Sequence, residues 1–418
     1  MQLKDVNLTA DQVKDITKKY HMETYERFPF VAVRAKDMYV YDENDTPYLD
    51  FYGGVAVNTA GSCNEKVVAA VKEQVGQLMH TFNYPYTIPQ TVLAEKICTT
   101  IGMDRIIYQN SGTEANEAAI KLARKYGVDK YGPEHYHIVC ALKSFHGRTY
   151  GAMTATGQPG SAQWAGYEPL LPGFSYAEFN NLQSFIDLCD ENTTAIMFEP
   201  CQGEGGVYPA TQEFMKGIRD FCTKNDILMI LDEVQAGWGR TGEIMAYMNY
   251  GIKPDIVTMA KAIGGGMPIA AMCATKEAAA AFTAGSHGST YAGSPVCCAA
   301  ALAQINEILD RDLPGNAKKV GDYFREKLAT LPYVKEVRGM GLFVGVEFDI
   351  PGKDNFCVDI KHGCIDRKVL VTAIGTKIIR MVPPLIATEE DCDKAYEALK
   401  DAELQRSEER RVGKECRS

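Results

Sequence analysis

Apolar and polar residues follow two different patterns through the middle of the chain. Short, nearly continuous apolar runs predict strands at 105–109, 137–142, 195–199, 227–231, 256–259 and 270–274. Between these runs, apolar residues recur at helical spacing, as they do from Ala115 to Tyr126. Strands that alternate with helices predict an α/β fold whose mostly parallel sheet is covered by helices on both faces. Ligands of such sheets bind beyond the carboxyl ends of the strands.

Both ends of the chain differ from this middle part. The middle part predicts a large α/β domain at 59–310. Residues 311–405 predict a smaller α+β domain, whose expected strands are 343–348, 368–371 and 377–381. Residues 1–58 predict helix and a short meander with strands at 38–41 and 48–51. This segment is too small to fold alone, so we expect it to pack with the small domain or with a partner subunit. Residues 406–418 are mostly charged and lack an apolar face, which predicts a disordered or artefactual tail.

The composition narrows the class of protein. The chain has 418 residues, 46% of them hydrophobic and 23% charged, which excludes a disordered or fibrous protein. Its net charge of −10 argues against nucleic acid or an anionic membrane as a partner. No apolar run is long enough to span a bilayer, and the N-terminus lacks the apolar core of a signal peptide. The 13 cysteines lack the spacing of a metal site and indicate reduced thiols in the cytoplasm.

The first candidate site is Ser111-Gly112-Thr113-Glu114, which follows a predicted strand and begins a predicted helix. Ser111 and Glu114 have the spacing of a capping box. A helix N-terminus with free N–H groups, a glycine and hydroxyls is suited to bind a phosphate. The alternative interpretation is that Ser111 only caps the helix.

Two further segments follow predicted strands. Asp232 and Glu233 stand at the end of an apolar run, where a carboxylate needs a cationic partner or serves as a cap. Lys261 follows the next run and precedes three consecutive glycines. Desolvation at such a position lowers the pKa of an amine, which can then form a Schiff base, although most single lysines extend to the surface. A phosphate site, an acid and a reactive lysine are together what pyridoxal 5′-phosphate (PLP) requires.

Longer motifs carry a resemblance to a known family. They include 110–117 (NSGTEANE), 145–149 (FHGRT), 199–206 (EPCQGEGG), 287–291 (HGSTY) and 380–385 (RMVPPL). With these motifs in this order, the chain resembles the class III aminotransferases of the fold-type I PLP family. It is most similar to the acetylornithine/ornithine aminotransferase branch.

The resemblance implies a role for each matching residue. Lys261 is the residue that bonds covalently to the cofactor, Asp232 pairs with the ring nitrogen, and Gln235 bonds the phenolic oxygen. Phe145 stacks on the ring, and Thr290 reaches the phosphate from the neighbouring subunit of a homodimer with shared sites. The cofactor-binding residues that it implies are Ser111, Gly112, Thr113, Phe145, His146, Asp232, Gln235, Lys261 and Thr290.

The substrate is also implied by the resemblance. Arg148 binds a substrate carboxylate, because guanidinium suits bidentate carboxylate recognition, and Glu204 and Arg380 belong to a branch that uses glutamate. The expected reaction transfers an amino group from an ω-amino acid of the N-acetylornithine or ornithine type to 2-oxoglutarate, giving an aldehyde or semialdehyde and glutamate. The substrates are therefore small amino acids and 2-oxo acids.

Other functions stay open to different degrees. Residues 291–295 (YAGSP) resemble 4-aminobutyrate aminotransferases, so transamination of 4-aminobutyrate or another ω-amine is the alternative. Residues 60–65 (AGSCNE) lack two histidines that are usual in the family, and Trp238 adds unexplained bulk. Glu204 and Arg380 argue against an aminomutase. Retention of the catalytic set argues against an inactive regulator, and the lack of GxGxxG after the first strand of the α/β region argues against a dehydrogenase.

Overall fold

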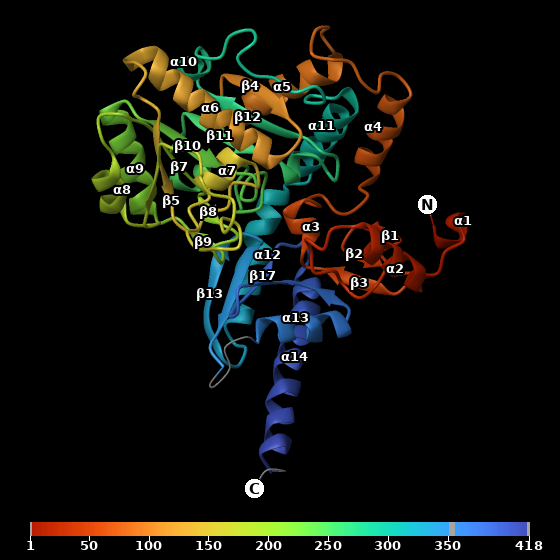
Figure 1. The fold of residues 1–418 in the computed structure, drawn as a ribbon. Helices are drawn as coiled ribbons and strands as arrows, with labels where there is room; N and C mark the ends of the chain where they lie inside the picture. Colours follow the sequence, from red (N-terminus) through yellow and green to blue (C-terminus); the bar gives the residue numbers. More distant parts are fainter. Residues whose placement is uncertain (1, 351–355, 416–418) are drawn as a thin grey trace.

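The apolar runs of the middle of the chain form one seven-stranded sheet. Our computed structural model describes residues 2–350 and 356–415, with side chains up to residue 402 (Figure 1). The strands, in their order across the sheet, are β4 (Arg105–Gln109), β12 (Ala270–Ala274), β11 (Ile256–Met259), β10 (Leu228–Asp232), β7 (Thr193–Phe198), β5 (His137–Ala141) and β6 (Phe174–Ala177). Strand β12 is antiparallel to both neighbours and the other pairs are parallel, which confirms the mostly parallel sheet.

Both faces of this sheet are buried, because successive side chains of a strand enter different hydrophobic clusters. In β10, Leu228 and Ile230 pack on one face, whereas Met229 and Leu231 pack on the other. This is why the strands have continuous apolar runs. The surrounding helices are α5 (Ile88–Ile101), α6 (Gly112–Tyr131), α7 (Tyr150–Ala155), α8 (Leu182–Leu188), α9 (Gln212–Asn225), η1 (Ala246–Tyr250), η2 (Lys261–Ile263), α10 (Lys276–Ala279) and α11 (Pro295–Asp310). A small ribbon, β8 (Cys201–Gln202) and β9 (Tyr208–Pro209), extends from the loop after β7.

The C-terminal part contains a second, antiparallel sheet in the order β13-β14-β17-β16. Its strands are β13 (Val334–Met340), β14 (Phe343–Phe348), β17 (Ile378–Met381) and β16 (Thr372–Ile374), with helices α12 (Leu313–Leu328), α13 (Cys357–Asp366) and α14 (Glu389–Glu415). Sequence periodicity did not predict β13 or β16. Helix α14 projects away from the body of the molecule (Figure 1).

The N-terminal segment joins the C-terminal part through a shared sheet. It contains α1 (Leu3–Val6), α2 (Ala10–Tyr20), β1 (Arg34–Lys36), β2 (Tyr39–Tyr41), β3 (Pro47–Asp50), α3 (Gly53–Ala56) and α4 (Glu65–Val75). Strand β15 (Val369–Leu370) pairs in parallel with β3, so the run predicted at 368–371 belongs to the N-terminal sheet.

The end of the chain differs from the expectation of a disordered tail over 406–418. The backbone of α14 continues as helix through residue 415, and residues 416–418 lie outside those described. Residues such as Glu, Arg and Lys are good helix formers, and extension of an existing helix avoids a new nucleation step.

Candidate active site

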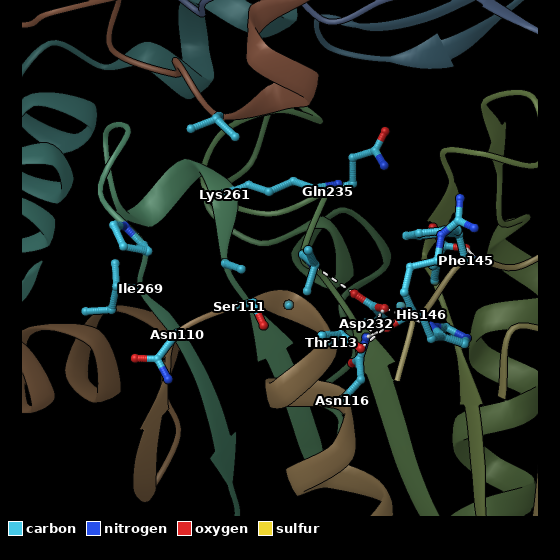
Figure 2. A pocket seen from close by; sticks show the side chains of 18 of the residues that line it. Asn110, Ser111, Thr113, Asn116, Phe145, His146, Asp232, Gln235, Lys261 and Ile269 are labelled. Atoms are coloured by element: carbon cyan, nitrogen blue, oxygen red, sulfur yellow. Dashed lines mark hydrogen bonds and ion pairs between the residues drawn. The ribbon is translucent and has the colours of Figure 1, made fainter. Parts of the chain in front are cut away.

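A cavity of about 420 Å³ lies where the central strands end (Figure 2). Strand β10 ends at Asp232, and the loops after β4, β5 and β11 supply other walls. The residues predicted from the sequence that line this cavity are Ser111, Gly112, Thr113, Phe145, His146, Arg148, Asp232, Gln235 and Lys261. Glu204 and Arg380 lie beside the cavity in contact with Gln235. Thr290 is exposed and is not among the residues that line the cavity.

One wall of the cavity is the first turn of helix α6. Ser111 is its N-cap, and the hydroxyl accepts a hydrogen bond from the N–H of Glu114 at 3.4 Å. Thr113 contacts the loop after β5, because its hydroxyl accepts the N–H of Arg148 at 3.2 Å. Gly147 has a φ of +140°, and a Cβ there would collide with the Thr113 hydroxyl. Close packing of this loop on a helix N-terminus makes a site for an anion.

Asp232 is the buried acid of the cavity, with 3% of its surface exposed. Its Oδ2 accepts hydrogen bonds from Nδ1 of His146 and Nδ2 of Asn116, each at 2.7 Å. Its Oδ1 accepts the N–H of Val234 at 2.9 Å. These donors replace the water that a buried carboxylate loses. Figure 2 shows His146 and Asn116 converging on Asp232.

Glu199 is a second buried acid at the cavity. Its carboxyl group accepts the N–H of Phe145 at 3.0 Å and that of Gly203 at 3.3 Å. Burial raises the pKa of Glu199 well above its usual range, and the neighbouring charge of Asp232 raises it further. Sequence analysis included Glu199 in a motif but predicted no role for it.

Lys261 follows strand β11 after one intervening residue and begins the short helix η2. Its backbone has a φ of +45°, a left-handed conformation that is uncommon for a residue with a side chain. Burial lowers the pKa of the Lys261 amine, and the nearby Glu204 opposes this shift. A lowered pKa increases the share of neutral amine, which is the nucleophilic form.

Glu204 and Arg380 form an ion pair next to Gln235. Arg380 lies on β17 of the C-terminal sheet, and Glu204 lies between β8 and β9 of the large domain. Nη1 of Arg380 also donates to Oε1 of Gln235 at 3.0 Å, and its Nε donates to Oγ1 of Thr372 at 3.3 Å. Burial alone would raise the pKa of Glu204, but the charge and hydrogen bond of Arg380 outweigh it and lower that pKa. Both residues are therefore charged and paired.

Arg148 stands at the exposed part of the cavity. Its guanidinium carbon lies 5.5 Å from the centre of the Phe145 ring, and its backbone N–H bonds Thr113. No ion pair to its guanidinium is found among the described residues. A cation in this position is free to bind an anionic group that enters the cavity.

Trp238 and the 60–65 segment, which sequence analysis singled out, lie outside the cavity lining. Trp238 is fully buried in the main hydrophobic core. In the 60–65 segment, Oδ1 of Asn64 caps helix α4 by accepting the N–H groups of Lys66 and Val67, and its Nδ2 bonds Glu307 at 2.9 Å. These residues therefore serve packing and helix capping.

Comparison with known proteins agrees with this geometry. Residues 20–402 match the family described as aminotransferase class-III. The chain is 44% identical to an acetylornithine aminotransferase of Caldanaerobacter subterraneus, over 92% of this chain and 97% of that protein. It is 42% identical to one of Methanocaldococcus jannaschii, over 92% and 96% of the two chains.

The chain belongs to the class III aminotransferases. Among solved structures it is similar to the ornithine aminotransferase of Toxoplasma gondii, with a TM-score of 0.92, 28% identity and coverage of 97% and 98% of the two chains. The acetylornithine aminotransferase of Elizabethkingia anophelis gives a TM-score of 0.84 at 28% identity, covering 95% and 100%. The fold is therefore that of the fold-type I PLP-dependent transferases, and the protein is a PLP-dependent transaminase.

The cavity fits PLP on the evidence of its own residues. The N-terminus of α6 suits the phosphate, Asp232 suits a basic ring nitrogen, and Lys261 supplies an amine for the aldehyde. Nε2 of His146 is buried without a partner among the described residues, which leaves Nδ1 to carry the hydrogen donated to Asp232. When bound, PLP supplies a ring that accepts the electrons of a bond broken at the amine-bearing carbon.

No helix among those the structure describes combines the length and apolar character needed to cross a membrane.

Proposed function

We propose that this transaminase takes the amino group of an ω-amino acid of the N-acetylornithine or ornithine type and transfers it to 2-oxoglutarate, leaving an aldehyde or semialdehyde and glutamate. The observation that carries the proposal is the Glu204–Arg380 ion pair beside the cavity. An ω-amino acid has no carboxylate next to its reacting amine, so a covered Arg380 suits it. Glutamate has such a carboxylate, and an uncovered Arg380 suits that substrate. The names of the relatives at 44% and 42% identity support the same substrate class.

The residues of the cavity divide the work of this reaction. Lys261 would hold the cofactor and carry the proton that leaves the amine-bearing carbon of the substrate, helped by its lowered pKa. Asp232 would pair with the ring nitrogen and keep its proton in place. Ser111, Gly112 and Thr113 hold the phosphate with the N–H groups of the first turn of α6. Phe145 would stack on the ring, His146 would hold Asp232 through its Nδ1, and Gln235 would bond the phenolic oxygen of the cofactor.

Two arginines bind the carboxylates of the substrates. Arg148 lines the cavity, its guanidinium has no ion pair among the described residues, and it binds the carboxylate far from the reacting amine in both half-reactions. Arg380 binds the carboxylate next to the amine of glutamate. Glu204 pairs with Arg380 while the ω-amino acid reacts and moves away when glutamate enters.

A panel of amino donors with 2-oxoglutarate tests this proposal by measuring glutamate formation. N-Acetylornithine or ornithine should be used with a kcat/KM well above that of 4-aminobutyrate. The opposite order would support the alternative, 4-aminobutyrate transamination, which the sequence at 291–295 favours. Lack of glutamate formation from every ω-donor would overturn the proposed function.

We also propose a homodimer that shares its active sites. Met79, Tyr84, Tyr86 and Tyr291 are exposed apolar residues, and His80 lies against Tyr291 with ring centres 5.2 Å apart. An apolar surface of this kind marks a protein contact. Thr290 adjoins this surface, and we propose that it reaches the phosphate of the partner's cofactor.

Hybrid dimers test the shared site directly. Lys261→Ala and Thr290→Asp each inactivate the proposed site, the first by removing the amine and the second by placing a negative charge at the phosphate. If Thr290 serves the partner's site, a mixed dimer has one site with both defects and one with neither, so mixing the two inactive variants restores activity. Mixing that restores no activity, in a sample shown by its mass to contain hybrid dimers, would refute sharing.

We further propose a cytoplasmic location, which the free cysteines of the described part of the chain support.

A further inference from the structure

A hydrogen-bonded chain behind the cavity connects two strands and a helix through Asn116. Oγ1 of Thr258 donates to Oδ1 of Asn116 at 2.7 Å, and Nδ2 of Asn116 donates to Oδ2 of Asp232 at 2.7 Å. Nδ2 also donates to the backbone carbonyl of His146 at 2.7 Å. Thr258 and Asp232 are register partners on the parallel strands β10 and β11, and Asn116 lies on α6 above them.

The orientation of the Asn116 amide follows from its partners. The carbonyl of His146 can only accept hydrogen bonds, so the NH₂ group must face it. The amide oxygen then faces Thr258, whose hydroxyl must donate. The His146 carbonyl therefore fixes the orientation that directs an N–H toward Asp232, and the Thr258 hydroxyl satisfies the amide oxygen on the other side.

The position of Asn116 argues against a role in packing alone. Asn116 is 1% exposed and Thr258 is 0% exposed. Asn116 lies on a buried helix face whose other residues, such as Ala119 and Ile120, are apolar. A buried amide is unfavourable unless all of its groups are bonded, and here both ends are. An apolar residue would suit packing, so the amide points to a task at Asp232.

We propose that Asn116, held between the His146 carbonyl and the Thr258 hydroxyl, is a positioning residue of the transamination. Its amide holds Asp232 as a carboxylate directed to the cavity, so that the ring nitrogen of bound PLP keeps its proton. This inference rests on the proposed role of Asp232. A hydrogen bond donated to a carboxylate stabilises its charged form. When an acid and a ring nitrogen share one proton, stabilising the carboxylate leaves the proton on the nitrogen. Asn116 does not touch the reacting atoms and acts through Asp232.

The test measures the ring nitrogen in the holoenzyme. The enzyme is loaded with PLP carrying ¹⁵N in the ring, and its NMR chemical shift reports whether the nitrogen is protonated. Asn116→Leu removes the donor at similar volume and should move the signal toward that of unprotonated pyridine. It should lower kcat by about tenfold or more while KM changes little, as expected for loss of a hydrogen bond to a charge. Thr258→Val keeps Asn116 but leaves its buried amide oxygen without the Thr258 donor, which loosens the amide, and should shift the signal in the same direction by a smaller amount.

Two further variants make each outcome decisive. Thr194→Val removes another buried hydroxyl, which bonds the Ala123 carbonyl on the same helix, and should leave the nitrogen signal unchanged. Asp232→Asn removes the acid itself and should give the largest shift. The comparison requires that Asp232→Asn shifts the nitrogen signal. If it does, an unchanged signal in Asn116→Leu overturns the role of Asn116. If Asn116→Leu does not fold, an unchanged signal in Thr258→Val overturns it instead. If Asp232→Asn also leaves it unchanged, the role of Asp232 in the proposed function fails instead.

Discussion

Removal of Glu204 should separate the two half-reactions of the enzyme. Arg380 has 5% of its side chain exposed and Glu204 has 29%, so the ion pair between them is partly shielded from water. In Glu204→Ala, the guanidinium keeps only neutral acceptors, Oε1 of Gln235 and Oγ1 of Thr372. Loss of a partner from a fully buried pair costs about 3–5 kcal/mol. Because water reaches Glu204, the cost of losing it lies between the range for a buried pair and the ~1 kcal/mol of an exposed pair. We use about 2 kcal/mol for this pair.

This energy acts in opposite directions on the two substrates. In the proposed mechanism, the native enzyme separates the pair before glutamate binds Arg380, and the variant does not need this step. The half-reaction with glutamate should therefore be retained or accelerated, by up to about 30-fold for ~2 kcal/mol at ~1.4 kcal/mol per decade. The half-reaction with the ω-donor should slow by a similar factor, because its chain meets an uncovered cation. α-Amino acids should become better donors.

Single-turnover rates of the cofactor's absorbance change, measured separately with glutamate and with the ω-donor, provide the assay. The matched control is Glu336→Ala, which removes the acid paired at 2.8 Å with Arg338, a buried arginine of the same small sheet. That variant should leave the ratio of the two rates unchanged. An equal effect of Glu204→Ala on both half-reactions would show that Glu204 is only structural and would refute the reasoning.

Three other substitutions test the cavity. Lys261→Ala should abolish turnover and covalent attachment of the cofactor, although the phosphate site can still bind it. Borohydride treatment followed by mass spectrometry should then find no fixed cofactor. Wild-type turnover would contradict the role of Lys261. Asp232→Asn should lower kcat by at least ~10²-fold, roughly 3 kcal/mol, with an unchanged circular dichroism spectrum, and a near-normal rate would reject its role at the ring nitrogen. Gly147→Ala should raise the Kd of PLP by about tenfold or more (~1.4 kcal/mol per decade), because its Cβ displaces the Thr113 hydroxyl. Gly160→Ala is its control, since φ there is +74° and the space is open, and equal retention of PLP by both would contradict the collision.

The central strands could be predicted from sequence because burial on both faces requires continuous apolar residues. Strands β4, β11 and β12 begin and end where the apolar pattern predicts. The missed strands lie at edges, where pairing holds a strand whose side chains are only partly buried. Strand β6 forms one edge of the large sheet, and β13 and β16 form the two edges of the small one. Polar residues along β13, such as Lys335 and Glu336, hide its period from sequence analysis.

Much of the cavity could also be predicted, because motifs at strand ends converge in a parallel sheet. The position of Thr290 relative to a cofactor depends on a second chain, so its role stays a prediction. Asn116 was missed as a site residue although it lies within a recognised motif. The available signal was an amide on a helix face whose other buried residues are apolar. Its partner could not be found, because the contact with Asp232 depends on how α6 crosses the sheet.

The acids around the cavity show how the fold gives the same chemical group different surroundings. Glu199 accepts the backbone N–H groups of Phe145 and Gly203, and burial together with the charge of Asp232 raises its pKa. Glu204 meets Arg380 from the C-terminal sheet, which lowers its pKa. Asp232 meets His146 and Asn116, both from the large domain. A movement of the C-terminal part would therefore change the surroundings of Glu204 but leave the donors of Asp232 in place. This separation allows a substrate-dependent change at Arg380 without disturbance of Asp232, the acid proposed to pair with the cofactor.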